Sequence, residues 1–171
     1  MEVIKKRIEK DVVNIYHITD THTGSENQRT DKLKELVNII KNDKNGYWLG
    51  GGDYCEAIVM SDPRFSPGEL QKKYHLKDLV DLPRVQMKEF YKLIEPIKDK
   101  CIGLLIGNHE EQYIRRNHFN VMDYLASDLM GHPELKLGHD GYILLTTGTN
   151  TKRQTRIFAT HGEGISGSPR D

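Results

Sequence analysis

Three short apolar runs, each followed directly by a polar turn, constrain the fold of this chain most strongly. The β-branched run of residues 12–18 ends before Asp20, the run 47–49 ends in three glycines before Asp53, and the run 101–106 ends in a turn that starts with glycine. Runs of this length that stop at glycine or polar residues are typical of buried strands. Because open α/β sheets bind ligands at the carboxyl ends of their strands, we expect the three turns to meet there.

Helical patterns alternate with these runs. Apolar side chains recur at helical spacing over residues 30–42 and again over 85–97. This alternation predicts a mostly parallel sheet with helices packed against it. Farther along, two β-rich runs, 142–147 and 153–160, are joined by a turn that contains glycine and asparagine, and they predict a hairpin in a second sheet stacked on the first. The length of the chain fits a single α/β domain over residues 1–171.

The polar turns carry the side chains that bind divalent ions. Asp20 and His22 stand two residues apart, so both side chains can point the same way from an extended segment. Mixed carboxylate, amide and imidazole sets suit ions such as manganese, iron or zinc. Two such ions about 3.5–4 Å apart can hold both the attacking and the leaving oxygen of a phosphoester. The candidate ligands are Asp20, His22, Asp53, Asn108 and His161, with His109 remaining as an acid or base.

The order of the motifs D-x-H, G-D, G-N-H-E and H-G resembles that of the calcineurin-like metallophosphoesterase superfamily, over about residues 12–165. Each motif alone is short enough to occur by chance, whereas four in this order, three of them after an apolar run, are specific. The resemblance implies two stacked mixed β-sheets flanked by helices, a four-layer sandwich. It also implies a metal-dependent phosphoesterase that hydrolyses phosphomonoesters or phosphodiesters through a dinuclear metal centre.

The resemblance also implies a role for each ligand by its position in the motifs. Asp20 and His22 would bind the first metal ion, and Asp53 would bridge both ions. Asn108 and His161 would bind the second ion. A bridging anion is expected physically, because two divalent ions at this separation repel each other strongly. Manganese is the ion we expect to support activity in vitro.

The G-N-H-E turn contributes two further residues. His109 cannot easily bind the same ion as its neighbour Asn108, so we expect it to be catalytic, by protonating the leaving oxygen or stabilising charge in the transition state. Glu110 is expected behind the ligands, where it would orient an imidazole or a backbone amide. Glu56 fits either an ordinary helix residue or a similar supporting role. His17, within a predicted strand, is expected to be structural.

The chain departs from the superfamily pattern at its end. The family finishes with G-H-x-H, whose two histidines complete the two metal sites, and no such motif is present. We expect a domain that lacks this segment, with His161 as the family's earlier, isolated histidine. Five protein ligands then remain, and weaker metal binding is expected. In a second register, Glu163 replaces the last histidine and His132 or His139 is the earlier ligand.

Composition narrows the classes of function. The chain has 25 Lys+Arg and 25 Asp+Glu, so no net charge draws it to nucleic acid or to an acidic membrane. A nuclease of the same superfamily would need a local basic stripe. A scaffold that has lost its metals is the other alternative, although such a protein has no reason to keep all these residues. Two cysteines, no signal-peptide pattern and no long apolar run favour a reducing, cytoplasmic setting without membrane contact.

The region between residues 60 and 80 is the main irregular part of the sequence. It is largely polar and contains two prolines, which predicts an insertion near the site, where such segments commonly determine substrate choice. Several cations in and beyond it could bind substrate phosphates, although surface charge is the commoner role. They are Arg64, Lys72, Lys73, Arg115 and Arg116.

Overall fold

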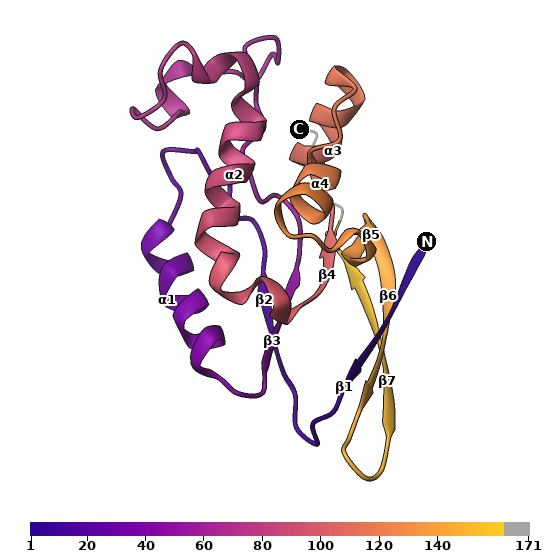
Figure 1. The fold of residues 1–171 in the computed structure, drawn as a ribbon. Helices are drawn as coiled ribbons and strands as arrows, with labels where there is room; N and C mark the ends of the chain where they lie inside the picture. The colour runs from indigo at the N-terminus through magenta and orange to yellow at the C-terminus, as the bar shows by residue number, and fades with distance from the viewer. Residues whose placement is uncertain (163–171) are drawn as a thin grey trace, which may run out of the picture.

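The central sheet of the protein has four parallel strands, as seen in a computed structural model that describes residues 1–162 (Figure 1). Neighbouring strands follow one another in chain order, so each crossover adds the next strand beside the previous one, in the same direction across the sheet. The mostly parallel sheet predicted from the alternation of strands and helices is confirmed, whereas the mixed pairing that the resemblance implied for both sheets is found in the second sheet. Its strands are β2 (Asn14–Ile18), β3 (Gly46–Gly50), β4 (Cys101–Leu105) and β5 (Lys136–Gly138).

Two long helices, α1 (Thr30–Asn42) and α2 (Leu82–Ile94), cover one face of this sheet. The predicted bounds of the first helix are confirmed. The second starts three residues earlier than predicted, because Pro83 suits the first turn of a helix. It ends at Ile94, three residues before the predicted end, because Pro96 has no N–H to continue the helical hydrogen bonds, and the chain continues as the 3₁₀ segment η3 (Glu95–Lys100).

The core between the helices and the sheet is built on large aromatic side chains. Trp48, Tyr54 and Phe90 are fully buried there, and the indole Nε1 of Trp48 donates to the carbonyl oxygen of Ile97 at 2.8 Å. A buried indole needs such a partner, because an unpaired N–H in an apolar core is costly. This contact ties η3, which follows α2, to β3, the strand that precedes Asp53.

A three-stranded mixed sheet packs on the opposite face of the central sheet. Its order is β1-β6-β7, with β1 (Glu2–Ile8) parallel to β6 (Asp140–Thr147) and β7 (Arg153–Thr160) antiparallel to β6. The predicted hairpin and second sheet are therefore confirmed. The strand β1 was missed, because Lys6 interrupts the apolar side of its alternation between Ile4 and Ile8.

The outer face of this second sheet carries no helix within the part of the chain that the structure describes. Val3, Tyr142 and Phe158 are neighbours across the three strands on that face, and all three are exposed. The helical layer expected on this side therefore has no counterpart among residues 1–162. Across the same residues, no helix has the length and apolar character that crossing a bilayer requires.

The remaining segments are short, apart from α3, and connect the strands and the two long helices. Residues 60–80, where an insertion is predicted, contain short 3₁₀ turns and no long helix or strand. The chain then reaches the site again through a helix that begins in the G-N-H-E turn. These segments are η1 (Pro67–Glu69), η2 (Asp78–Asp81), α3 (Asn108–Asn117), α4 (Val121–Asp123), the π-helical η4 (Tyr124–Leu129) and η5 (Pro133–Leu135).

Asp62 anchors the insertion to α3. Its carboxylate is buried and accepts hydrogen bonds from Arg64 at 3.1 and 3.0 Å, and it also pairs with Arg116 of α3. The hydrogen bonds from Arg64 lower the pKa of Asp62 from 3.8 to about 2. The pair therefore stabilises the fold at pH values above about 4, and this contribution is lost as the pH falls through the folded-state pKa.

We expect Asp62→Asn to lower the free energy of unfolding by about 2 kcal/mol at pH 7, from a pKa shift of nearly two units. The difference between the variant and the wild type should shrink as the pH falls from 5 toward 2, because the wild-type carboxylate becomes protonated. Urea unfolding at pH 7, 5, 4 and 3 measures this. A difference that stays constant over that range would contradict the role of the charge.

Candidate metal centre

The D-x-H and G-D turns are held together by backbone hydrogen bonds at the carboxyl edge of the central sheet. The N–H of Asp20 donates to the oxygen of Gly52 at 3.1 Å, and the N–H of His22 donates to the oxygen of Asp53 at 3.0 Å. The third turn joins them, since the N–H of His109 donates to Oδ1 of Asp53 at 3.0 Å. Three turns that are far apart in sequence therefore form one rigid cluster.

Three of the candidate ligands have unusual backbone conformations. The φ angles of Asp20, His22 and Asp53 are 52°, 40° and 52°, in the left-handed region that residues with a Cβ rarely occupy. Each such residue costs of order 1–3 kcal/mol, and such strain persists only where surrounding contacts hold it. Its concentration in adjoining turns is typical of a functional site.

Asp53 lies at the centre of the cluster. Its side chain is 5% exposed, and its Oδ2 lies 3.8 Å from Nε2 of His22 and 3.5 Å from Nε2 of His161. Two groups of side chains in the described residues could each hold a metal ion, and Asp53 belongs to both. One group is His22, Asp53 and His109, and the other is Asp20, Asp53 and His161.

This grouping differs in part from the predicted roles. Asp20 belongs to the same group as His161 rather than to the group of His22, although its Oδ1 also lies 3.9 Å from Nε2 of His22. Asn108 lies where the second ion was predicted, since its Oδ1 is 3.2 Å from Nε2 of His161. All five predicted ligands are therefore brought to one place, and their individual roles remain predictions.

His22 and His161 are both oriented through the ring nitrogen that faces away from the centre. Nδ1 of His22 contacts Oε2 of Glu56 at 3.1 Å, and Nδ1 of His161 donates to the carbonyl oxygen of Gly51 at 2.6 Å. Histidines that bind metals commonly have one nitrogen held in this way, which fixes the tautomer and leaves the other nitrogen for the ion. In both histidines Nε2 is the nitrogen that faces Asp53.

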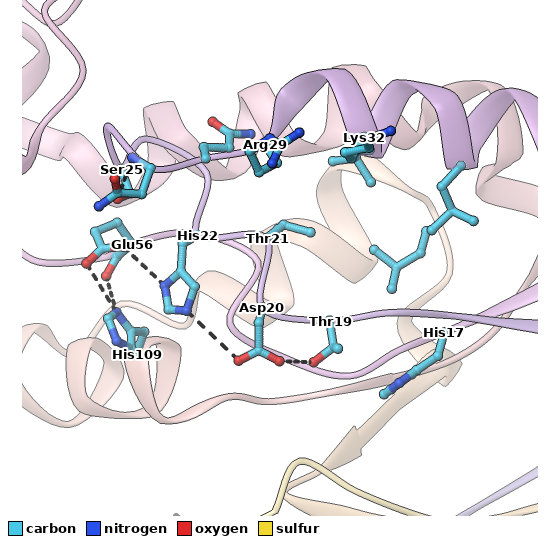
Figure 2. Close-up of a pocket in the computed structure, with 15 residues that line it drawn as sticks. His17, Thr19, Asp20, Thr21, His22, Ser25, Arg29, Lys32, Glu56 and His109 are labelled. Atoms are coloured by element: carbon cyan, nitrogen blue, oxygen red, sulfur yellow. Dashed lines mark hydrogen bonds and ion pairs between the residues drawn. The ribbon is translucent and has the colours of Figure 1, made fainter.

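Glu56 holds two histidines at once (Figure 2). Its carboxylate contacts His22, and its backbone oxygen accepts from Nδ1 of His109 at 2.6 Å. The hydrogen bond to Glu56 raises the pKa of His22 against the effect of burial. Burial works against the Glu56 carboxylate, yet its contacts with these imidazoles keep its pKa below the usual value. The role of Glu56 was left open from the sequence, although this residue follows Asp53 of the G-D motif by three positions.

Glu110 holds the backbone of the turns that form the centre. Its carboxylate is fully buried and accepts hydrogen bonds from three backbone amides, those of Asp53 at 2.9 Å, Cys55 at 3.1 Å and Gly107 at 3.1 Å. Burial and the charge of Asp53 raise its pKa. Of the two targets predicted for Glu110, an imidazole or a backbone amide, the structure shows backbone amides.

Two glycines allow the turns to approach this closely. A Cβ on Gly107 would lie 2.0 Å from Oδ1 of Asp53, a separation that no side chain tolerates. Gly52 has φ +97°, and a Cβ there would meet the backbone of Gly107 and the ring of His161. Any larger residue at either position would push Asp53 or His161 away from the centre.

The alternative histidines lie outside the two groups. His132 pairs with Asp99 and Glu134, and His139 pairs with Glu111 at 2.7 Å. Neither contributes to a group that could hold a metal among residues 1–162. Glu163, which the second register would need, lies outside the described residues.

The cations that could bind phosphate are mostly held in ion pairs. Arg64 and Arg116 share Asp62, Lys73 pairs with Glu89, and Arg115 pairs with Glu111. Arg64 is also close enough to the centre for the charges of Glu56 and Asp53 to raise its pKa further, after the larger effect of Asp62. His17, expected to be structural, is exposed and lines a cleft beside Asp20.

Comparison with known families agrees with this geometry. The pattern of the calcineurin-like phosphoesterase family matches residues 13–169, which is most of the chain. The protein therefore belongs to the calcineurin-like phosphoesterase family, whose members are generally phosphoester hydrolases. No curated protein and no solved structure matches the chain.

Proposed function

We propose that the protein is a metal-dependent phosphoesterase that hydrolyses phosphomonoesters or phosphodiesters at a dinuclear centre. One observation carries the proposal: a single buried carboxylate, Asp53, belongs to both of the groups that could hold an ion. A shared anion is what two neighbouring divalent ions need to offset their repulsion. Family membership supports the same reaction class.

The donor set fits such ions. Carboxylate oxygens from Asp20 and Asp53, imidazoles from His22 and His161 and the amide oxygen of Asn108 match the preferences of manganese, iron or zinc. When bound, the two ions would supply positive charge to the phosphoryl oxygens and lower the pKa of a coordinated water. The protein side chains fix the positions of these charges before substrate arrives.

His109 is placed to move a proton. Its Nδ1 donates to the backbone oxygen of Glu56, so its Nε2 remains for a substrate atom. The ring is 13% exposed and lines the cleft that opens beside the centre. It packs edge-on against His22, with ring centroids 4.7 Å apart, which holds its plane. We assign it the protonation of the leaving oxygen.

His109→Ala is expected to lower kcat by roughly 10²–10⁴-fold, the range found when a general acid is lost. The number of bound ions should not change, because the five proposed ligands remain. Steady-state kinetics and metal analysis of the purified variant measure both quantities. Loss of one ion together with activity would instead make His109 a ligand, which its place in a group with His22 and Asp53 also permits.

The proposed function is tested by metal titration followed by a substrate panel. Calorimetry with manganese should give two ions per chain. Manganese-supplemented assays with p-nitrophenyl phosphate, bis-p-nitrophenyl phosphate, cyclic nucleotides and single- and double-stranded DNA then separate monoesterase, diesterase and nuclease activities. Binding of no ion, together with no turnover of any substrate, would refute the proposal in favour of a metal-free scaffold.

A further inference from the structure

A cleft of about 620 Å³ leads away from the metal centre toward α1 (Figure 2). Asp20, His22, Glu56 and His109 line the side of it at the centre, and residues of the segment 27–36 line the wall formed by α1 and the turn before it. Ligand pockets commonly enclose 300–1,000 Å³, so this cleft is large enough for a group of nucleotide size. The metal centre is thus continuous with a preformed binding volume.

The cleft begins on the side of the centre where His22 and His109 lie. His109 lines it, whereas Asn108 and His161 do not. On the proposed function, on which this inference rests, His109 protonates the leaving oxygen. The part of the substrate that departs with that oxygen therefore occupies the cleft, and the structure of the cleft selects the leaving group.

Charge is distributed unevenly along the cleft. The side at the centre carries the carboxylates of Asp20 and Glu56, and the facing wall at the start of α1 carries Arg29 and Lys32 (Figure 2). The two cations pair with Asp31 and Glu35 at the surface, at 3.1 and 2.9 Å, with all four side chains more than half exposed. Exposed pairs of this kind contribute little free energy, so either cation can turn to a stronger anion. A phosphate group on the leaving part would be placed at the α1 wall.

The rest of the cleft suits a nucleoside. Half-buried Leu36 gives it an apolar wall, to which Ile18 and Leu33 add little surface because they are 2% and 7% exposed. Asn27 supplies an amide that can hydrogen-bond to the edge of a base. The exposed imidazole of His17 lies along the same cleft and offers a flat face for stacking. The groups needed for a sugar and a base thus line the same cleft as the two cations.

We propose that the cleft binds a leaving group that is itself a nucleotide, with its own phosphate held by Arg29 and Lys32. The substrate would then be a phosphodiester between nucleosides whose leaving side carries a second phosphate. Arg29 and Lys32 are the specificity-determining residues of this reaction, and His17 with the apolar wall holds the nucleoside.

Binding to metal-free protein tests the cleft independently of turnover. Calorimetry in EDTA would compare adenosine 5′-monophosphate with adenosine, which lacks only the phosphate. We expect the monophosphate to bind about 10-fold more tightly, the size of one charge-assisted contact. Arg29→Ala and Lys32→Ala should each reduce this ratio, and Lys34→Ala, on α1 but outside the cleft, should leave it unchanged.

His17→Ala separates the nucleoside from the phosphate part of the site. It should weaken binding of adenosine and of its monophosphate by the same factor, because stacking is independent of the phosphate. Equal affinity of the wild type for the two ligands, or a ratio that Arg29→Ala and Lys32→Ala both leave unchanged, would overturn the inference.

Kinetics distinguish failure of this inference from failure of the proposed function. With manganese, the dinucleotide TpT would be compared with its phosphorylated forms, pTpT and TpTp. One phosphorylated form should have kcat/KM about 10-fold higher than TpT, and Arg29→Ala and Lys32→Ala should remove this preference. Hydrolysis of all three at equal rates would refute the cleft inference alone. No hydrolysis of these or of the nitrophenyl esters would refute both.

Discussion

Asp53→Asn is expected to abolish phosphoesterase activity, with a loss of at least about 10⁴-fold in kcat/KM. The substitution removes the only charge shared by the two groups that could hold an ion, so both ions should bind more weakly and their charge stabilisation, several kcal/mol, is lost. An asparagine still offers an oxygen to the N–H of His109, so the turn itself should persist. Metal analysis and steady-state kinetics measure the outcome.

A control measurement and a control variant accompany this experiment. The midpoint of thermal unfolding in EDTA should be close to that of the wild type, which separates loss of metal from loss of fold. Asp128→Asn, an equivalent change at an exposed residue outside the centre, should keep both activity and metal content. Two fully occupied ions in the Asp53 variant would contradict the bridging role.

Glu110→Ala is expected to produce the largest loss of stability. It removes a fully buried carboxylate that accepts from three backbone amides, and it leaves those N–H groups without a partner in a dry environment. Breaking a buried charged network in this way typically costs 3–5 kcal/mol, a large part of the 5–15 kcal/mol that stabilises a whole domain. The free energy of unfolding in urea measures the effect.

The neighbouring residue supplies the matched control. Glu111→Ala removes a partly exposed carboxylate that pairs with Arg115 and His139, and it should cost at most about 1 kcal/mol. Where Glu110→Ala does not fold, Glu110→Gln keeps the shape and one acceptor oxygen and should give an intermediate loss. Equal effects of the Glu110 and Glu111 substitutions would show that the buried carboxylate does not support the turns.

The parallel strands and the hairpin could be predicted because their signals are local. Each apolar run that leads to Asp20, Asp53 or Asn108 forms a strand of the central sheet, and the helix over residues 30–42 has the predicted bounds. The first strand of the second sheet could not be found in this way. Lys6 breaks its alternation, and only pairing with residues 141–147 makes the segment a strand.

Residue types and apolar runs are enough to predict the donor set and the positions of the ligands on the fold. Residue types decide which ions can be bound, and the period of an apolar run decides where a strand ends, so Asp20, Asp53 and Asn108 were placed from local pattern alone. The sequence also identified His161 as the preferred isolated histidine, but it left His132 and His139 as alternatives.

Which of those histidines lies beside Asp53, and which contacts support it, depends on how distant segments pack together. His161 meets Gly51 across 110 positions of the chain, and Glu56 reaches His22 across 34 and His109 across 53. Contacts of this kind leave no local periodicity, because they depend on how strands, turns and helices pack together rather than on the conformation of one segment. The cleft that runs from His109 to α1 has the same origin, since its two walls come from separate elements.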